Sequence, residues 1–196
     1  MAVDDPVGVL DRITVIFEVL GEDDRGMGVS ELAQRTGLPK STVSRLVSGL
    51  VDRRYLERDG STIRLGVRLF ELGQLAEAPQ RLRRAALPMM SALRTETGAT
   101  VELAIRDGAD MVLIAMVRDR APDVSRRIGD RTPALERRDT PGPSRVTRPV
   151  RVFSAGIDAA ITLVFPGDVD VNAAPLEAAA RAIERGLECG DYSGLT

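Results

Sequence analysis

The chain has 196 residues, of which 43% are hydrophobic and 29% charged, a composition typical of a globular protein. Its 27 basic and 29 acidic residues nearly cancel, and it contains no histidine and a single cysteine, Cys189. These counts exclude an imidazole base, a Ser-His-Asp triad, an intramolecular disulfide and a thiolate metal site. We therefore expect no enzymatic activity, cofactor or metal. We also expect a cytoplasmic protein, because residues 1–8 lack a secretion signal and no apolar run is long enough to cross a membrane.

Charge is distributed unevenly along the first third of the chain. Residues 1–33 carry eight acidic and two basic side chains, whereas residues 34–68 carry eight basic and three acidic ones. A basic block in a neutral chain is typical of a DNA-binding surface. A solvated arginine-rich face explains the block equally well, so its structural setting has to decide.

Three helices are predicted in the first part of the chain. The Asp5–Pro6 pair is typical of a helix start, and the apolar spacing that follows predicts a helix that ends at Gly21. A short second helix spans 31–36, and Gly37 supplies the tight turn after it. The third helix begins at Pro39.

The third helix has an apolar face and a polar face. Near its N-terminus the polar face presents Lys40, Ser41, Thr42, Ser44 and Arg45. Small hydroxyl side chains let a helix approach the major groove closely, while long cations bind base edges and phosphates. A three-helix bundle with a polar outer face that binds nothing has the same pattern.

A β-hairpin is predicted directly after the helices. Residues 61–65 alternate in polarity after the turn sequence Arg58-Asp59-Gly60. Three helices followed by such a hairpin predict a winged helix-turn-helix domain over residues 1–66. Arg58 and Arg64 flank the turn, where we expect them to contact backbone phosphates.

These segments resemble the IclR family of bacterial transcriptional regulators. The specific parts are Leu-Pro-Lys-Ser-Thr-Val followed by Arg45-Leu46, and the two Leu-Gly pairs at 65–66 and 72–73. The resemblance covers 6–75. It implies a recognition helix that carries Lys40, Ser41, Thr42, Ser44 and Arg45. It also implies that the linker helix, over 67–78, is a dimer element, although its apolar face fits packing within one chain as well.

Residues 79–196 predict an antiparallel α+β domain. A helix comes first, with a kink or break expected near Leu87 because Pro88 follows. Two hairpins come next, with strands at 100–106, 111–118, 150–153 and 159–165, before a last helix over 172–187. The fold class is therefore α+β, and the resemblance implies a GAF-like effector domain.

The second domain departs from the family after Leu135. The family continues into a helix with a His-Ala-Thr-Ala-Leu-Gly-Lys-like motif, whereas residues 133–149 hold four prolines, Gly142 and several charges. This composition predicts a loop over 133–149 and a shortened effector domain. Three interpretations stay open: a reduced ligand pocket, a domain that only dimerises, or constitutive DNA binding.

The leading functional hypothesis is a sequence-specific transcriptional regulator, with repression as the simpler mode. It would bind double-stranded operator DNA as a homodimer or tetramer, possess no membrane segment, and respond to a small organic-acid effector at residues that the sequence does not identify. The alternatives are a constitutive DNA-binding or dimerisation protein and an interaction protein that does not bind DNA. Catalysis is disfavoured because the carboxylates of Glu102, Asp107 and Asp110 sit on or beside a hairpin, without a pocket-like apolar setting.

Overall fold

The computed structural model consists of two compact units, Met1–Leu75 and Ala76–Thr196. The residues that it describes are 8–118, 126–134, 144–152, 156–167 and 172–188. Asp5, Pro6 and Cys189 lie outside these ranges. Within them, no helix is long and apolar enough to cross a bilayer, and no cluster of side chains has the composition of a metal site.

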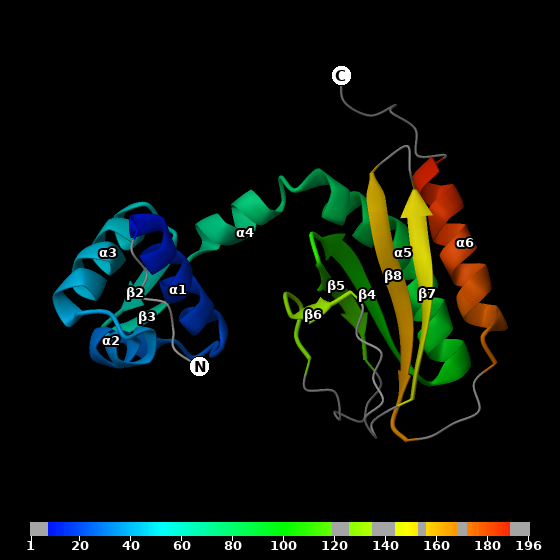
Figure 1. The fold of residues 1–196 in the computed structure, drawn as a ribbon, viewed down its shortest axis with the longest axis horizontal. Coiled ribbons are helices and arrows are strands. Elements are labelled where there is room, and N and C mark those ends of the chain that lie inside the picture. Colours follow the sequence, from blue (N-terminus) through cyan, green and yellow to red (C-terminus); the bar gives the residue numbers. More distant parts are fainter. Residues whose placement is uncertain (1–7, 119–125, 135–143, 153–155, 168–171, 189–196) are drawn as a thin grey trace. The chain divides into compact units, whose positions relative to one another are not determined.

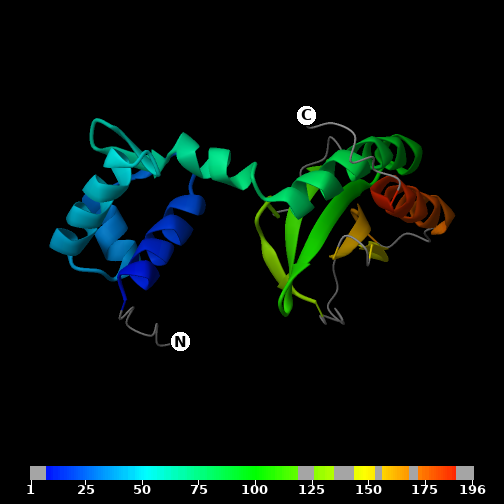
Figure 2. The same ribbon diagram turned by 90° about the horizontal axis from the view of Figure 1, so that it is seen from above.

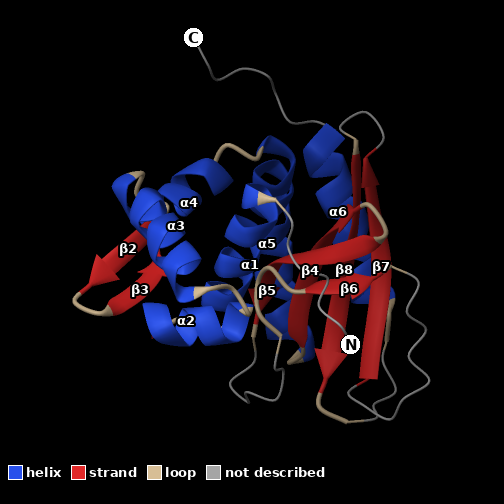
Figure 3. Ribbon diagram, turned by 60° about the vertical axis from the view of Figure 1, so that its left-hand side comes forward, coloured by secondary structure: helices blue, strands red, loops and turns tan. Residues whose placement is uncertain are grey.

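The first unit is a helical bundle with a small antiparallel sheet. Its elements are α1 (Val9–Gly21), β1 (Met27–Gly28), α2 (Val29–Thr36), α3 (Lys40–Asp52), β2 (Leu56–Asp59), β3 (Thr62–Leu65) and α4 (Val67–Gly73). The sheet order is β1-β3-β2, and the β2–β3 hairpin projects beside the helices (Figure 3). This arrangement confirms the predicted winged helix-turn-helix.

One apolar core holds the first unit together. Ile16 of α1, Leu32 of α2, Val43 and Val47 of α3 and Ile63 of β3 are each fully buried in it. These residues come from the apolar faces that the helical and strand periodicities predicted. The core therefore fixes which face of α3 stays in solvent.

The start of the first helix differs from the prediction. The helix begins at Val9, with Gly8 as its N-cap, rather than at Asp5–Pro6. The backbone N–H of Gly8 donates a 3.0 Å hydrogen bond to the carboxylate of Asp11, which lies in the first turn of the helix. A carboxylate at this place satisfies a free N–H group and interacts favourably with the helix dipole, so the helix can start here.

The second unit is a five-stranded antiparallel sheet covered by two helices. Its elements are α5 (Glu77–Thr97), β4 (Thr100–Asp107), β5 (Asp110–Val117), β6 (Arg131–Pro133), β7 (Ser144–Val152), β8 (Ile157–Phe165) and α6 (Ala174–Glu188). The strand order is β6-β5-β4-β8-β7. Both helices lie on the same face of the sheet (Figures 1 and 2), and the core of this unit lies between them and the strands.

The helix that contains Pro88 is continuous, so of the kink or break expected near Leu87 the break is wrong. Proline removes the hydrogen bond to the carbonyl of Arg84, but Pro88 and Arg84 both lie on the exposed side, where water can reach that carbonyl. On the other side Leu82 and Met90 are fully buried against the sheet. Tertiary packing thus holds the helix together across the proline.

The loop predicted over 133–149 is shorter than expected, because its last six residues belong to β7. That strand pairs with β8 from Ser144, opposite Phe165, to Val152, opposite Ile157. β7 is an edge strand, and an edge position tolerates Pro149 because one side of the strand needs no partner. Residues 135–143 lie outside the described ranges.

Candidate nucleic-acid interface

The outer surface of α3 carries the predicted recognition residues. Lys40, Ser41, Ser44 and Arg45 are all exposed, whereas Thr42 is half-buried at the flank of the helix. The buried residues Val43, Val47 and Leu50 form the opposite face. The structure therefore brings four of the five predicted residues onto one open surface.

Ser48, which is not among the predicted recognition residues, belongs to the same stripe. It is exposed and lies one turn beyond Ser44, to whose carbonyl oxygen its hydroxyl donates a 3.0 Å hydrogen bond. Its spacing of seven from Ser41 and four from Ser44 is the signal that identifies it. Three serines thus make a narrow ridge that a groove can receive.

Three of the predicted DNA-binding cations form no hydrogen bond or ion pair with the described residues. Within the described part of the chain, Lys40 and Arg45 on α3 and Arg58 on β2 have no hydrogen-bond or ion-pair partner, whereas most arginines of the second unit do. The backbone at the start of α3 adds free N–H groups and the positive end of the helix dipole. Together these groups give the exposed side of the domain a positive potential.

The two wing arginines lie on opposite faces of the hairpin. In the register of β2 and β3, Arg58 is opposite the buried Ile63, whereas Arg64 is opposite Glu57. Side chains of paired residues share a face, so Arg58 and Arg64 point to different sides. The structure does not bring these two predicted phosphate ligands together.

Arg64 is also held by its own domain. Its Nε donates to the carbonyl oxygen of Arg25 at 3.0 Å, and its Nη1 lies 3.4 Å from the Asp59 carboxylate. The neighbouring Gly26 has a φ of +74°, and a side chain there would collide with the carbonyl of Ile63 at 2.4 Å. These contacts join the wing to the loop after α1.

Helix α4 presents an exposed apolar surface. Phe70 is 66% exposed, and Val67 and Leu72 are exposed too. Leu75, just after the end of the helix, is 78% exposed. A single ion pair runs along the helix, in which Arg68 Nη1 lies 2.8 Å from the carboxylate of Glu71. Its hydrogen bond from Arg68 lowers the pKa of Glu71 below 4.5, the usual value. Large exposed apolar patches mark interaction surfaces.

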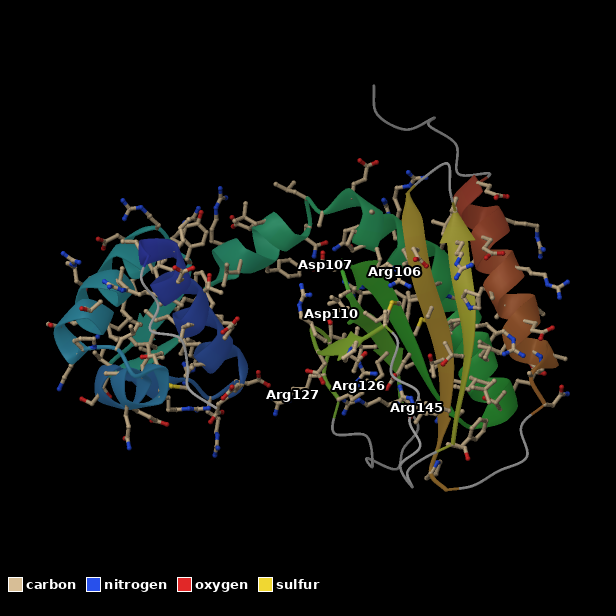
Figure 4. The ribbon with its side chains drawn as sticks, viewed as in Figure 1. Arg106, Asp107, Asp110, Arg126, Arg127 and Arg145 are labelled. Carbon is tan, nitrogen blue, oxygen red and sulfur yellow. The ribbon has the colours of Figure 1, made fainter. Side chains whose placement is uncertain are left out.

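The acidic residues considered for catalysis have different settings in the second unit. Asp107 and Asp110 (Figure 4) lie at the tip of the β4–β5 hairpin. Both pair with Arg131, whose pKa is raised mainly by its hydrogen bond to Asp107. Glu102 differs, because it is only 3% exposed and its carboxylate pairs with Arg126 and Arg145. All three residues lie on the predicted hairpin, and of the three only Glu102 is buried.

The geometry of the first unit defines its class. The first unit is a winged helix-turn-helix domain, a class in which the second helix of the motif lies in the major groove. Residues 9–60 match the family model described as the IclR helix-turn-helix domain. This match assigns residues 9–60 to the IclR helix-turn-helix domain.

Curated relatives agree with this classification. The chain is 40% identical over 115 residues to the HTH-type transcriptional regulator TsaQ1/TsaQ2 of Comamonas testosteroni, which covers 57% of this chain and 41% of that protein. It is 28% identical over 103 residues to the transcriptional repressor IclR of Escherichia coli, covering 52% and 38%. The chain therefore spans about two fifths of the length of these relatives.

A solved structure extends the likeness to the fold of both units. An IclR homologue from Microbacterium hydrocarbonoxydans, complexed with 4-hydroxybenzoate, is similar to this chain with a TM-score of 0.81 and 22% identity. The similarity covers 92% of this chain and 99% of that one. It confirms the α+β fold class with an N-terminal winged helix-turn-helix.

Proposed function

We propose that this chain is a transcriptional regulator that binds double-stranded operator DNA through the exposed face of α3. The observation that carries this proposal is a set of cations in an IclR helix-turn-helix domain that have no partner among the described residues. Lys40 and Arg45 lie beside the serine ridge of α3, and Arg58 lies on the wing. Hydroxyl side chains permit close approach to base edges, and Arg45 has the reach and geometry to bind a guanine edge. The two named relatives are transcriptional regulators rather than enzymes, and one is a repressor, which favours repression.

The experiment is selection of bound sequences from a random double-stranded DNA pool by the purified chain. We expect enrichment of an inverted repeat with two half-sites about one helical turn apart, or a multiple of it. A Lys40→Ala/Arg45→Ala double variant should enrich nothing. Arg181→Ala, which removes an exposed cation from α6 in the other unit, is the matched control and should select the same repeat. Failure of the unaltered chain to enrich any sequence would favour the interaction-protein alternative.

The assembly that fits this role is a homodimer, or a tetramer built from dimers. Support comes from the exposed apolar side chains of Phe70 in α4 and of Leu75 just after it, because exposing large apolar side chains to water gives no stability. Phe70→Asp should shift the mass measured by light scattering towards the monomer. Gln74→Asp places the same charge at an exposed position of the adjoining turn and should leave the mass unchanged.

The second unit fits an effector domain that binds a small organic acid. Its fold likeness to a homologue complexed with 4-hydroxybenzoate supports this role, as does a sheet with helices on one face only. The boundaries proposed for the chain are a DNA-binding domain over 1–66, a linker helix over 67–78 and this domain over 79–196.

A further inference from the structure

Helix α3 ends in a turn that has an arginine at the position that favours glycine. The N–H of Arg54 donates to the carbonyl oxygen of Val51, and the N–H of Tyr55 donates to that of Leu50, each at 2.9 Å. In this type of helix end, the residue at the place of Arg54 takes a left-handed conformation, which glycine adopts most readily. Arg54 has a φ of +63° and is the only residue other than glycine with a positive φ in the described part of the chain. Backbone strain of this kind marks positions where a side chain has a role.

The start of α4 is in contact with this turn. Gly66 is buried and is the N-cap of α4, and its N–H donates a 2.8 Å hydrogen bond to the carbonyl oxygen of Tyr55. A Cβ atom at Gly66 would lie 2.3 Å from the carbonyl oxygen of Arg54, so the two backbones are in direct contact. Arg54, Tyr55 and Gly66 thus form a corner, the α3–α4 corner, that joins the end of α3 to the start of α4.

Charged side chains connect this corner to the body of α4. Within α4, Arg68 Nη1 lies 2.8 Å from the carboxylate of Glu71. The pKa of Glu71 is lowered mainly by this hydrogen bond and further by the positive charge of Arg54. The pKa of Arg68 is raised mainly by its hydrogen bond to Glu71, with a smaller contribution from the hydroxyl of Tyr55. Both charged residues of this pair therefore interact with a residue of the α3–α4 corner.

Apolar packing does not fix the direction of α4. The helix has seven residues, Val67–Gly73, and none of them is buried. A helix this short has little stability of its own in water. Its direction relative to α3 therefore depends on the α3–α4 corner and on the charges around Glu71.

We propose that Arg54 acts on Glu71 to fix the angle between α3 and α4, and so sets the spacing between the two half-sites of the operator. This inference rests on the proposed function, in which α3 reads the DNA and α4 joins two chains. In such a dimer the distance between the two recognition helices has to match the distance between half-sites along the DNA. A variable angle would let one dimer bind several spacings. Arg54 is thus a positioning residue for DNA binding and makes no contact with the DNA.

The test uses the whole chain and synthetic operators that differ only in the spacing of their half-sites. The half-site sequence comes from the selection experiment, and base pairs are added to or removed from the spacer one at a time. Each base pair turns one half-site about the DNA axis by about a tenth of a helical turn. We expect the unaltered chain to bind one spacing at least tenfold more tightly than the neighbouring ones. Equal affinities for all spacings would overturn the proposal.

Arg54→Gly is the deciding variant, because glycine fits the turn better and removes the charge. We expect this variant to melt at a higher temperature than the unaltered chain and yet to lose the spacing preference. A retained preference would overturn the proposal. Loss of the preference together with a lower melting temperature would show that Arg54 only supports the fold, and would overturn it too.

Two further variants test the partner and the charge. Glu71→Gln removes the charge on which Arg54 acts, so it should lose the spacing preference as Arg54→Gly does. Arg54→Lys keeps the positive charge and should keep the preference. Arg53→Ala is the matched control, because it removes the neighbouring exposed arginine, whose guanidinium donates to the carbonyl oxygen of Gly49 at 2.9 Å. It should bind with the spacing preference of the unaltered chain, and its loss of the preference would deny Arg54 a specific role.

The salt dependence of binding tests for a direct contact between Arg54 and the DNA. On DNA with a single half-site, Arg54→Gly and the unaltered chain should have the same affinity and the same slope of log affinity against log salt. A slope that decreases by about one would show that Arg54 binds a phosphate, and would overturn the proposal.

These outcomes separate this inference from the proposed function. A chain that selects an inverted repeat and binds it as a dimer, but whose spacing preference does not depend on Arg54, refutes the inference alone. A chain that selects no DNA refutes the proposed function and the inference with it.

Discussion

Arg64 Nε donates a 3.0 Å hydrogen bond to the backbone carbonyl oxygen of Arg25, which joins β3 of the wing to the loop that follows α1. This bond links residues 39 positions apart, and Arg64 also approaches Asp59 of β2. A side chain with two such contacts positions the wing. Arg58, on the other face of the hairpin, makes no such contact with the described residues, and we expect it to bind phosphate.

Arg64→Ala should therefore lower the stability of the first unit and leave the number of phosphate contacts unchanged. We expect a loss of about 0.5–1.5 kcal/mol in the unfolding free energy, the range for one intramolecular hydrogen bond, at its lower end because the side chain is 45% exposed. Chemical denaturation measures it. The salt dependence of DNA binding should keep its slope.

Arg58→Ala should weaken DNA binding without changing the stability of the domain. Affinity should fall uniformly across DNA sequences, and the slope of log affinity against log salt should decrease by about one, because one phosphate contact is lost. Stability should not change. An unchanged slope of log affinity against log salt would show that Arg58 does not contact phosphate.

Arg45→Ala should relax sequence selectivity. If Arg45 binds a guanine edge with two hydrogen bonds, its loss costs about 1–3 kcal/mol at the cognate site and much less at random DNA. Competition binding with mutated operators is the measurement. An equal loss of affinity on all DNA sequences would instead show that Arg45 binds phosphate.

Gly66→Ala should destabilise the first unit strongly. A Cβ atom at this position would lie 2.3 Å from the carbonyl oxygen of Arg54 and 2.9 Å from the carbonyl carbon of Tyr55, both backbone atoms that cannot move aside easily. We expect a loss of about 1–3 kcal/mol or more. Gly73→Ala is the matched control, since nothing lies within 4 Å of its added Cβ and alanine favours helix by about 1 kcal/mol. Thermal unfolding should move in opposite directions for the two variants.

Lowering the pH should weaken the Arg68–Glu71 pair of α4. Because the folded pKa of Glu71 is depressed, its contribution to helix stability is complete above the unfolded pKa, near 4.5, and is lost as the pH falls through the lower folded pKa. An NMR titration of the Glu71 carboxyl carbon should show this depression. Arg68→Gln should raise the pKa back towards 4.5.

The sequence was most informative where the structure is locally determined. Gly37 ends α2 with a φ of +71°, and Gly60 lies in the turn of the wing hairpin with a φ of +58°. Glycine favours such positive φ values, so both turns could be predicted from the sequence. The polar face of α3 likewise followed from helical periodicity, apart from the flank position of Thr42 and the omission of Ser48.

Long-range pairing explains what sequence reasoning missed. The strand over 144–149 contains a proline and arginines and forms because β8 offers it a partner. Glu102 meets Arg126 from 24 residues away and Arg145 from 43 residues away, and no spacing rule connects them. The two-residue strand β1 could not be predicted from the sequence either, because it forms only by pairing with β3.

The edge strand β7 has a consequence for solubility. An unpaired strand edge is a template on which another chain can add a strand, and repeated addition leads to fibres. Here Pro149 removes one backbone donor from that edge, and Arg145, Arg148 and Arg151 place cationic side chains along it. Replacing the proline and these arginines by valine would turn a protected edge into an aggregation-prone one, even if the folded domain kept its shape.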